Sequence, residues 1–118
     1  MKIRHLKRSE DFKRISRQGE KYRGKTLTLA AETPDENESG LVVGVVAPRK
    51  AASDATVRNY VKRAIYGFFR REKESYVPGA KVVVSLARNI DGDTRNSLSA
   101  EVQKELKELS KEAGLTRR

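Results

Sequence analysis

Few side chains in this chain of 118 residues are suited to acid–base, nucleophilic or metal chemistry. His5 is the only histidine, and it stands in a basic N-terminal segment, residues 1–8, that we expect to be mobile. Asp91 and Asp93 lie two residues apart in a polar loop, but a calcium loop would need further oxygen ligands that this loop lacks. A protein nuclease needs a general base, a general acid or clustered carboxylates. We therefore predict no catalytic residue and no metal ligand in the protein.

The composition indicates the kind of partner. The net charge is +10, and only 36% of the residues are hydrophobic. Such an excess suggests a polyanion, either nucleic acid or an anionic membrane surface, because each Lys or Arg near a phosphate releases a condensed counterion. The absence of cysteine excludes disulfides, thiolate zinc sites and a cysteine nucleophile. No apolar run approaches the roughly 20 residues of a membrane span, and the N-terminus lacks the apolar stretch of a signal peptide. We expect an intact cytoplasmic protein.

The positive charge is concentrated in two blocks of the sequence. Residues 1–25 carry a net charge of +7 and residues 47–73 a net charge of +6, whereas residues 26–46 carry −4. We interpret the middle block as an acidic hairpin between two basic segments.

The second basic block contains the most informative element, a helix predicted over residues 54–76. At about 100° per residue its apolar side chains fall within one arc; these are Val57, Val61, Ala64, Ile65 and Phe68. The opposite arc holds Arg58, Asn59, Lys62, Arg63, Tyr66 and Arg70. No acidic residue occurs from 55 to 71, although an ordinary solvated helix mixes charges of both signs. A solvated basic face and a polyanion-binding face both fit this pattern, and the basic N-terminal block favours the second.

The remaining elements frame this helix. A short helix runs from Ser9, which suits an N-cap, to a stop at Gly19, with Phe12 and Ile15 on one face. Strands are predicted at 26–31, 41–46 and 81–87, and a last helix at 97–113. The order αββαβα predicts a single α+β domain over 1–118, with a small mixed sheet packed against helices and a frayed tail at 114–118.

The spacing Arg58-Asn59-x-x-Lys62-Arg63, with Arg49-Lys50 in the preceding loop, resembles the signature helix of the bacterial ribonuclease P protein family. The opening segment 6–14, followed by Gly19, is also similar to that family, and the resemblance covers about residues 4–113. Tyr60 stands where the signature usually has arginine, and Tyr66 where the family often has a basic residue. Ser16 stands where the opening helix often has a second aromatic, and Ala30 leaves the chemistry of the adjoining cleft open.

This resemblance implies a fold, a function and a set of contacts. The fold would be like the second domain of ribosomal protein S5, with a left-handed crossover, although about 98% of such crossovers are right-handed. The protein would be a subunit of an RNA-based endoribonuclease that removes the 5′ leader of precursor tRNA, with Mg²⁺ acting through the RNA and no small-molecule cofactor. Its partners would be ribonuclease P RNA and precursor tRNA. Contacts with the catalytic RNA would come from Arg49, Lys50, Arg58, Asn59, Tyr60, Lys62, Arg63, Tyr66 and Arg70, and contacts with the leader from Phe12, Arg8 and Lys13.

Two other functions fit the composition. A ribosomal or other structural RNA-binding protein shares the size, the charge and the fold type. A basic peripheral membrane module would need bulky apolar groups exposed opposite its basic face, but here we expect the sheet to cover the apolar faces.

Overall fold

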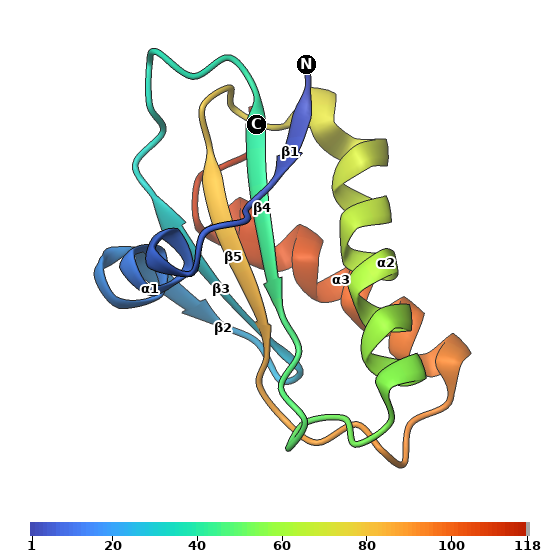
Figure 1. Cartoon of the computed structure of the whole chain (residues 1–118). Coiled ribbons are helices and arrows are strands. Elements are labelled where there is room, and N and C mark those ends of the chain that lie inside the picture. Colours follow the sequence, from blue (N-terminus) through green and yellow to red (C-terminus); the bar gives the residue numbers. More distant parts are fainter. Residues whose placement is uncertain (118) are drawn as a thin grey trace.

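The computed structural model describes residues 1–117, which form a five-stranded mixed sheet, three α-helices and a 3-10 turn (Figure 1). The elements follow one another in the order β1 (Ile3–His5), α1 (Ser9–Gln18), β2 (Glu20–Arg23), β3 (Leu27–Glu32), β4 (Leu41–Val46), α2 (Ala55–Glu72), η1 (Lys73–Ser75), β5 (Lys81–Leu86) and α3 (Arg95–Glu112). The α+β class is confirmed, and so are the three strands and three helices expected from the sequence.

The strand order across the sheet is β1-β4-β5-β3-β2. Strand β5 lies between β3 and β4, antiparallel to the first and parallel to the second. The prediction of a hairpin over residues 26–46 is therefore wrong, because β3 and β4 are not neighbours. Two valine-rich strands, β4 and β5, occupy the middle of the sheet, where both of their faces are covered. Helix α2 connects this parallel pair.

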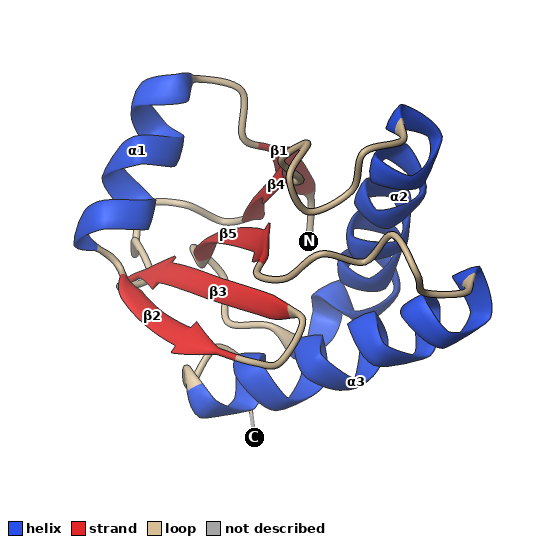
Figure 2. Cartoon of the chain, turned by 90° about the horizontal axis from the view of Figure 1, so that it is seen from below, coloured by secondary structure: helices blue, strands red, loops and turns tan. Residues whose placement is uncertain are grey.

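The helices cover the two faces of the sheet unequally (Figure 2). Helices α2 and α3 lie on one face and enclose the large core, to which β3 contributes Leu27 and Leu29 and α2 contributes Phe69. Helix α1 lies on the other face over a much smaller cluster. Ile15, Ala30 and Val83 are buried there, with Leu6 and Phe12 packed against them.

Both edges of the sheet are short strands that the sequence pattern did not reveal. Residues 3–5 of the segment expected to be mobile form β1, parallel to β4. Residues 20–23 form β2, antiparallel to β3. In the segment expected to fray, Leu115 is buried and its carbonyl accepts a hydrogen bond from the Val77 N–H at 2.8 Å. Arg118 lies outside the described residues.

Capping side chains set where the two long helices begin. The Asp54 carboxylate accepts a hydrogen bond from the Thr56 N–H at 2.8 Å, which fixes the start of α2 where the sequence predicted it. Helix α2 ends earlier than expected, at residue 72. Thr94 caps α3 in the same way. In α1, Ser9 is the first helical residue and not the cap, which is Arg8.

A buried carboxylate ties the turn between β2 and β3 to α3. Glu105 is 5% exposed, and its oxygens accept hydrogen bonds from the N–H groups of Thr26 at 3.0 Å and Leu27 at 2.9 Å. Within residues 1–117, no helix is long and apolar enough to cross a membrane.

Candidate nucleic-acid interface

Two loops at the same end of the sheet hold each other in place beside the N-terminus of α2. The loop between β5 and α3 donates the Ile90 N–H to the Ala51 carbonyl at 2.8 Å and the Asn89 side-chain amide to the Lys50 carbonyl at 2.9 Å. Arg49 and Lys50 themselves are exposed. The loop between β4 and α2 therefore has a fixed backbone from which two predicted RNA contacts extend into solvent.

The two aspartates considered as metal ligands have structural roles in these loops. Asp91 accepts a hydrogen bond from the Ser53 N–H at 3.0 Å, and Asp93 forms an ion pair with Arg88 at 2.7 Å. The Ser53 N–H lowers the pKa of Asp91, and the Arg88 side chain lowers the pKa of Asp93. Both stay ionised, so neither is suited to proton transfer near neutral pH. Within residues 1–117, no group of three or more His, Cys, Asp or Glu side chains is placed to hold a metal ion.

Arg58, the first residue of the signature, points back toward the loop that precedes α2. Its Nη1 atom donates to the carbonyls of Ala52 at 2.7 Å and Ser53 at 3.1 Å, and its side chain is half-buried. The sequence placed Arg58 on the open arc of the helix. In the structure, one nitrogen of the Arg58 guanidinium instead holds the loop by these two hydrogen bonds. Arg58 can reach the loop because it lies one helical turn after the cap, Asp54.

The open face of α2 is formed by Asn59, Lys62, Arg63 and Arg70, all of them exposed. Opposite it, Val61, Ile65 and Phe68 are buried, as the apolar arc predicted. The structure thus brings four of the predicted contacts together on one solvent-facing surface.

The two tyrosines of α2 are half-buried at the flanks of this face. The Tyr66 ring stacks on His5 of β1, with the ring centroids 3.8 Å apart, and burial raises the pKa of its hydroxyl. Tyr60 packs toward α3, where its hydroxyl donates to the Arg95 carbonyl at 3.2 Å. Both rings therefore have partners within the protein, and His5 has a packing role.

Among residues 1–117, the ion pairs lie outside α2 and the loop before it. The side-chain ion pairs of the described residues join Arg4 with Glu38, Arg14 with Asp11 and Glu32, Lys81 with Asp35 and Arg88 with Asp93. Among the described residues, no ion pair involves Arg49 or Lys50 of the preceding loop, or Arg58, Lys62, Arg63 or Arg70 of α2. We call these six residues, together with Asn59, the α2 surface.

Phe12 lies between α1 and the opposite face of the sheet. It is half-buried against the small cluster, and its ring covers Gly44 of β4. A Cβ atom on Gly44 would lie 2.6 Å from Cε1 of Phe12, so only glycine leaves room for the ring at this depth. The Phe12 ring thus packs on Gly44 and is also partly open to solvent.

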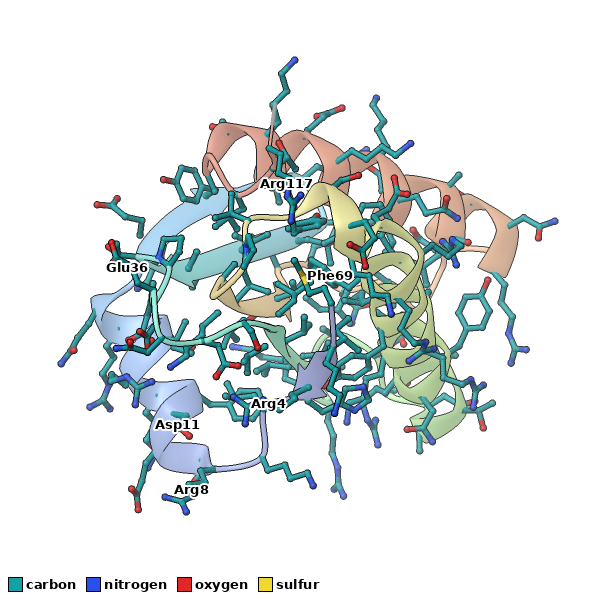
Figure 3. The ribbon with its side chains drawn as sticks, turned by 90° about the horizontal axis from the view of Figure 1, so that it is seen from above. Arg4, Arg8, Asp11, Glu36, Phe69 and Arg117 are labelled. Carbon is teal, nitrogen blue, oxygen red and sulfur yellow. The ribbon has the colours of Figure 1, made fainter. Side chains whose placement is uncertain are left out.

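The other two predicted leader contacts are Arg8, the cap of α1, and Lys13, which follows Phe12 on the helix. Arg8 lines an open groove of about 580 Å³ that also includes Arg4, Asp11 and Arg14. Figure 3 labels Arg8 at the start of α1, Asp11 in its first turn and Arg4 on β1. Lys13 is exposed on the helix.

Sequence reasoning missed a row of residues that crosses the sheet next to Phe12. Val46, Ser85, Thr28 and Arg23 are successive partners in the register of β4, β5, β3 and β2. They lie two residues from the positions that pack beneath α1, so they share that face of the sheet. Val46 is 36% exposed there. The alternation within each strand contained this information, but only the strand order places the four residues in one row.

The fold and the unpaired cations define a small α+β protein with a basic surface of the kind that polyanions contact. Residues 1–113 match the Ribonuclease P family. The chain is 32% identical to the ribonuclease P protein component of Pseudanabaena sp. (strain PCC 6903) over 81 residues, which cover 69% of each chain. It is 32% identical over 101 residues to that of Beutenbergia cavernae, covering 86% of this chain and 80% of the relative.

Solved structures show the same fold. The RNase P protein of Staphylococcus aureus superposes with a TM-score of 0.79 at 20% identity, covering 96% of this chain and 97% of the other. That of Thermotoga maritima superposes with a TM-score of 0.69 at 22% identity, covering 88% and 96%. This chain therefore belongs to the ribonuclease P protein family, whose members are components of a tRNA-processing endoribonuclease with an RNA subunit.

Proposed function

We propose that this protein binds the catalytic RNA of ribonuclease P through the α2 surface and binds the 5′ leader of precursor tRNA in the cleft between α1 and the sheet. The observation that carries this proposal is the concentration of unpaired cations on one face of α2 and on the loop before it. No ion pair of the described residues involves a cation of the α2 surface, and residues 55–71 contain no acidic residue that could neutralise one. Unpaired exposed cations keep their full charge for a phosphate backbone.

The RNA side of the interface combines point charges with one amide. Lys62, Arg63 and Arg70 offer cations that neutralise phosphates, and Asn59 offers a donor and an acceptor for base or sugar edges. The fastened loop adds Arg49 and Lys50. Because the backbone of the loop is already hydrogen-bonded to its neighbour, little conformational entropy is lost when the RNA docks.

The leader side relies on stacking more than on charge. Phe12 offers the edge of a fixed ring, and the row from Val46 to Arg23 offers an apolar group, two hydroxyls and a cation beside it. Single-stranded RNA with unstacked bases suits such a surface, because aromatic rings stack on any base and hydroxyls bond sugar and base edges. Arg8 lies at the start of α1 and Lys13 on its exposed side, and both would contact leader phosphates.

We assign cleavage to the RNA and its bound Mg²⁺, with no small-molecule cofactor. The protein screens repulsion between two polyanions and holds the leader, so that enzyme and substrate meet at lower magnesium. This reaction would take place in the cytoplasm, where precursor tRNA is made and trimmed.

The test is reconstitution with a bacterial ribonuclease P RNA at a magnesium concentration too low for the RNA alone. We expect the mixture to cleave precursor tRNA and the protein alone to leave it uncut. Cleavage by rigorously RNA-free protein would refute the assignment of catalysis. Tight RNA binding without stimulated cleavage would instead support a structural RNA-binding protein, and binding to anionic vesicles without RNA binding would support the membrane module.

A further inference from the structure

Arg95, the first residue of α3, is held against the flank of α2 by Tyr60. The guanidinium carbon lies 5.3 Å from the centroid of the Tyr60 ring, and the Tyr60 hydroxyl donates to the Arg95 carbonyl at 3.2 Å. The ring is half-buried against the large core, so it is a fixed platform, while Arg95 itself is exposed. One aromatic side chain therefore orients both the backbone and the side chain of Arg95.

The position of Arg95 is unfavourable for the stability of its own helix. The first turn of a helix carries a partial positive charge and favours acidic residues, but the first turn of α3 contains none. Among residues 1–117, no carboxylate forms an ion pair with Arg95. A cation with no carboxylate partner and an unfavourable helix position is available to an anionic ligand.

This cation adjoins the α2 surface. Tyr60 and Arg63 lie three residues apart on α2, so their side chains are neighbours on one side of the helix. The path from Arg63 across the Tyr60 ring to Arg95 therefore forms a continuous basic strip that passes from α2 to the start of α3. Figure 1 shows that α2 and α3 begin at the same end of the molecule.

We propose that Arg95 is a phosphate contact for the catalytic RNA, and that Tyr60 is the positioning residue that holds it there. This inference rests on the proposed function and extends the RNA interface from α2 onto a second helix. In the complex, the guanidinium keeps its place over the ring and donates its N–H groups to the RNA backbone.

The experiment measures binding of the full chain to ribonuclease P RNA at a series of salt concentrations. The variants are Arg95→Ala, Tyr60→Leu and the double variant, with Lys111→Ala as the control. Lys111 is an exposed cation on the last turn of the same helix, about 24 Å from Arg95 along the axis. Arg95→Ala is expected to weaken binding about three- to tenfold more than Lys111→Ala, and to flatten the log–log salt dependence by about 0.7–0.9.

The Tyr60 variants separate positioning from a purely structural role. Tyr60→Phe keeps the ring and should bind nearly as the wild type, whereas Tyr60→Leu should lose binding in the wild-type background but little more when Arg95 is already alanine. Thermal midpoints measured in parallel identify any variant that fails to fold. Wild-type binding by Arg95→Ala, or a loss equal to that of Lys111→Ala, overturns the inference while leaving the proposed function intact. Absence of binding by the wild-type protein would overturn the proposed function itself.

Discussion

Replacement of Phe12 by alanine should lower both the stability of the protein and its affinity for the 5′ leader, and the two losses can be measured separately. Full burial of a phenylalanine makes its truncation cost about 3–5 kcal/mol. Phe12 is half-buried over a small cluster, so we expect about 2 kcal/mol, or roughly an 8 °C lower unfolding midpoint for a domain of this size. Loss of a stacked base costs a further 1–3 kcal/mol, which is about 5- to 150-fold in affinity for the leader.

The assay compares the reconstituted RNA–protein complex on two substrates, precursor tRNA with a long leader and precursor tRNA whose leader is cut to a single nucleotide. Phe12→Ala should weaken binding of the long-leader substrate only. Phe12→Leu is the matched control, because leucine keeps most of the apolar volume and should cost less than about 1.5 kcal/mol of stability. It lacks the ring, however, and should lose leader affinity as alanine does.

A change on the sheet tests the same reasoning without touching Phe12. Gly44→Ala places a Cβ atom where the ring now lies, 2.6 Å from Cε1 and 2.9 Å from Cζ, so the ring must move outward. Leader affinity should fall while binding to the catalytic RNA stays unchanged. If Phe12→Leu binds long leaders normally, or if Phe12→Ala affects both substrates equally, then Phe12 is a packing residue and the cleft assignment is wrong.

Three further outcomes follow from the structure. Arg63→Ala should weaken RNA binding more than Lys111→Ala and flatten the salt dependence by about one unit for each phosphate that the protein no longer neutralises; equal effects of the two substitutions would show that only net charge matters. The Glu105 carboxylate accepts hydrogen bonds from backbone N–H groups, and Glu105→Gln replaces one of its oxygens by an amide group that can only donate. The substitution should lower the free energy of unfolding by about 1–3 kcal/mol in denaturant titrations without changing RNA affinity. Burial raises the pKa of Tyr76 to about 12, against about 10 for an unfolded phenol. Its contribution to stability should therefore persist below about pH 10 and disappear between about pH 10 and 12. Tyr76→Phe should flatten that alkaline fall of the unfolding midpoint, even though it leaves the Ser110 hydroxyl without its 2.6 Å partner.

The elements predicted correctly are those whose signal is local. Asp54 followed by a long apolar arc gives α2 its start and its buried side, and runs of valine give β4 and β5. The edge strands had no such signal. Strand β1 has three residues, two of them exposed, and β2 is mostly charged, so neither shows the alternation of a half-buried strand. Their pairing depends on neighbours that are distant in the sequence.

Strand order and side-chain partners were beyond sequence reasoning for the same reason. The insertion of β5 between β3 and β4 depends on pairing between strands that are far apart in the sequence, which no turn residue encodes. Helical periodicity placed Arg58 and Tyr66 on the open arc, since a helical wheel contains no neighbouring elements. In the structure, Arg58 donates a hydrogen bond to the preceding loop, and His5 of β1 stacks on Tyr66. Lys62 and Arg63 have no such neighbour, and their prediction as exposed side chains is confirmed.

The position of the acidic loop between β3 and β4 explains how a chain with both signs of charge keeps its basic surface effective. In this loop, Glu38 pairs with Arg4 and Asp35 pairs with Lys81. Both carboxylates lie near the N-terminal end of β4 (Figure 1). The α2 surface starts beyond the other end of β4. Six residues of extended chain separate the two ends by about 20 Å. That is more than two Debye lengths at physiological salt, where the length is about 8 Å. The acidic loop therefore hardly weakens the field around Arg49, Lys50 and the first turns of α2, and RNA docked there would have the acidic loop turned away from it.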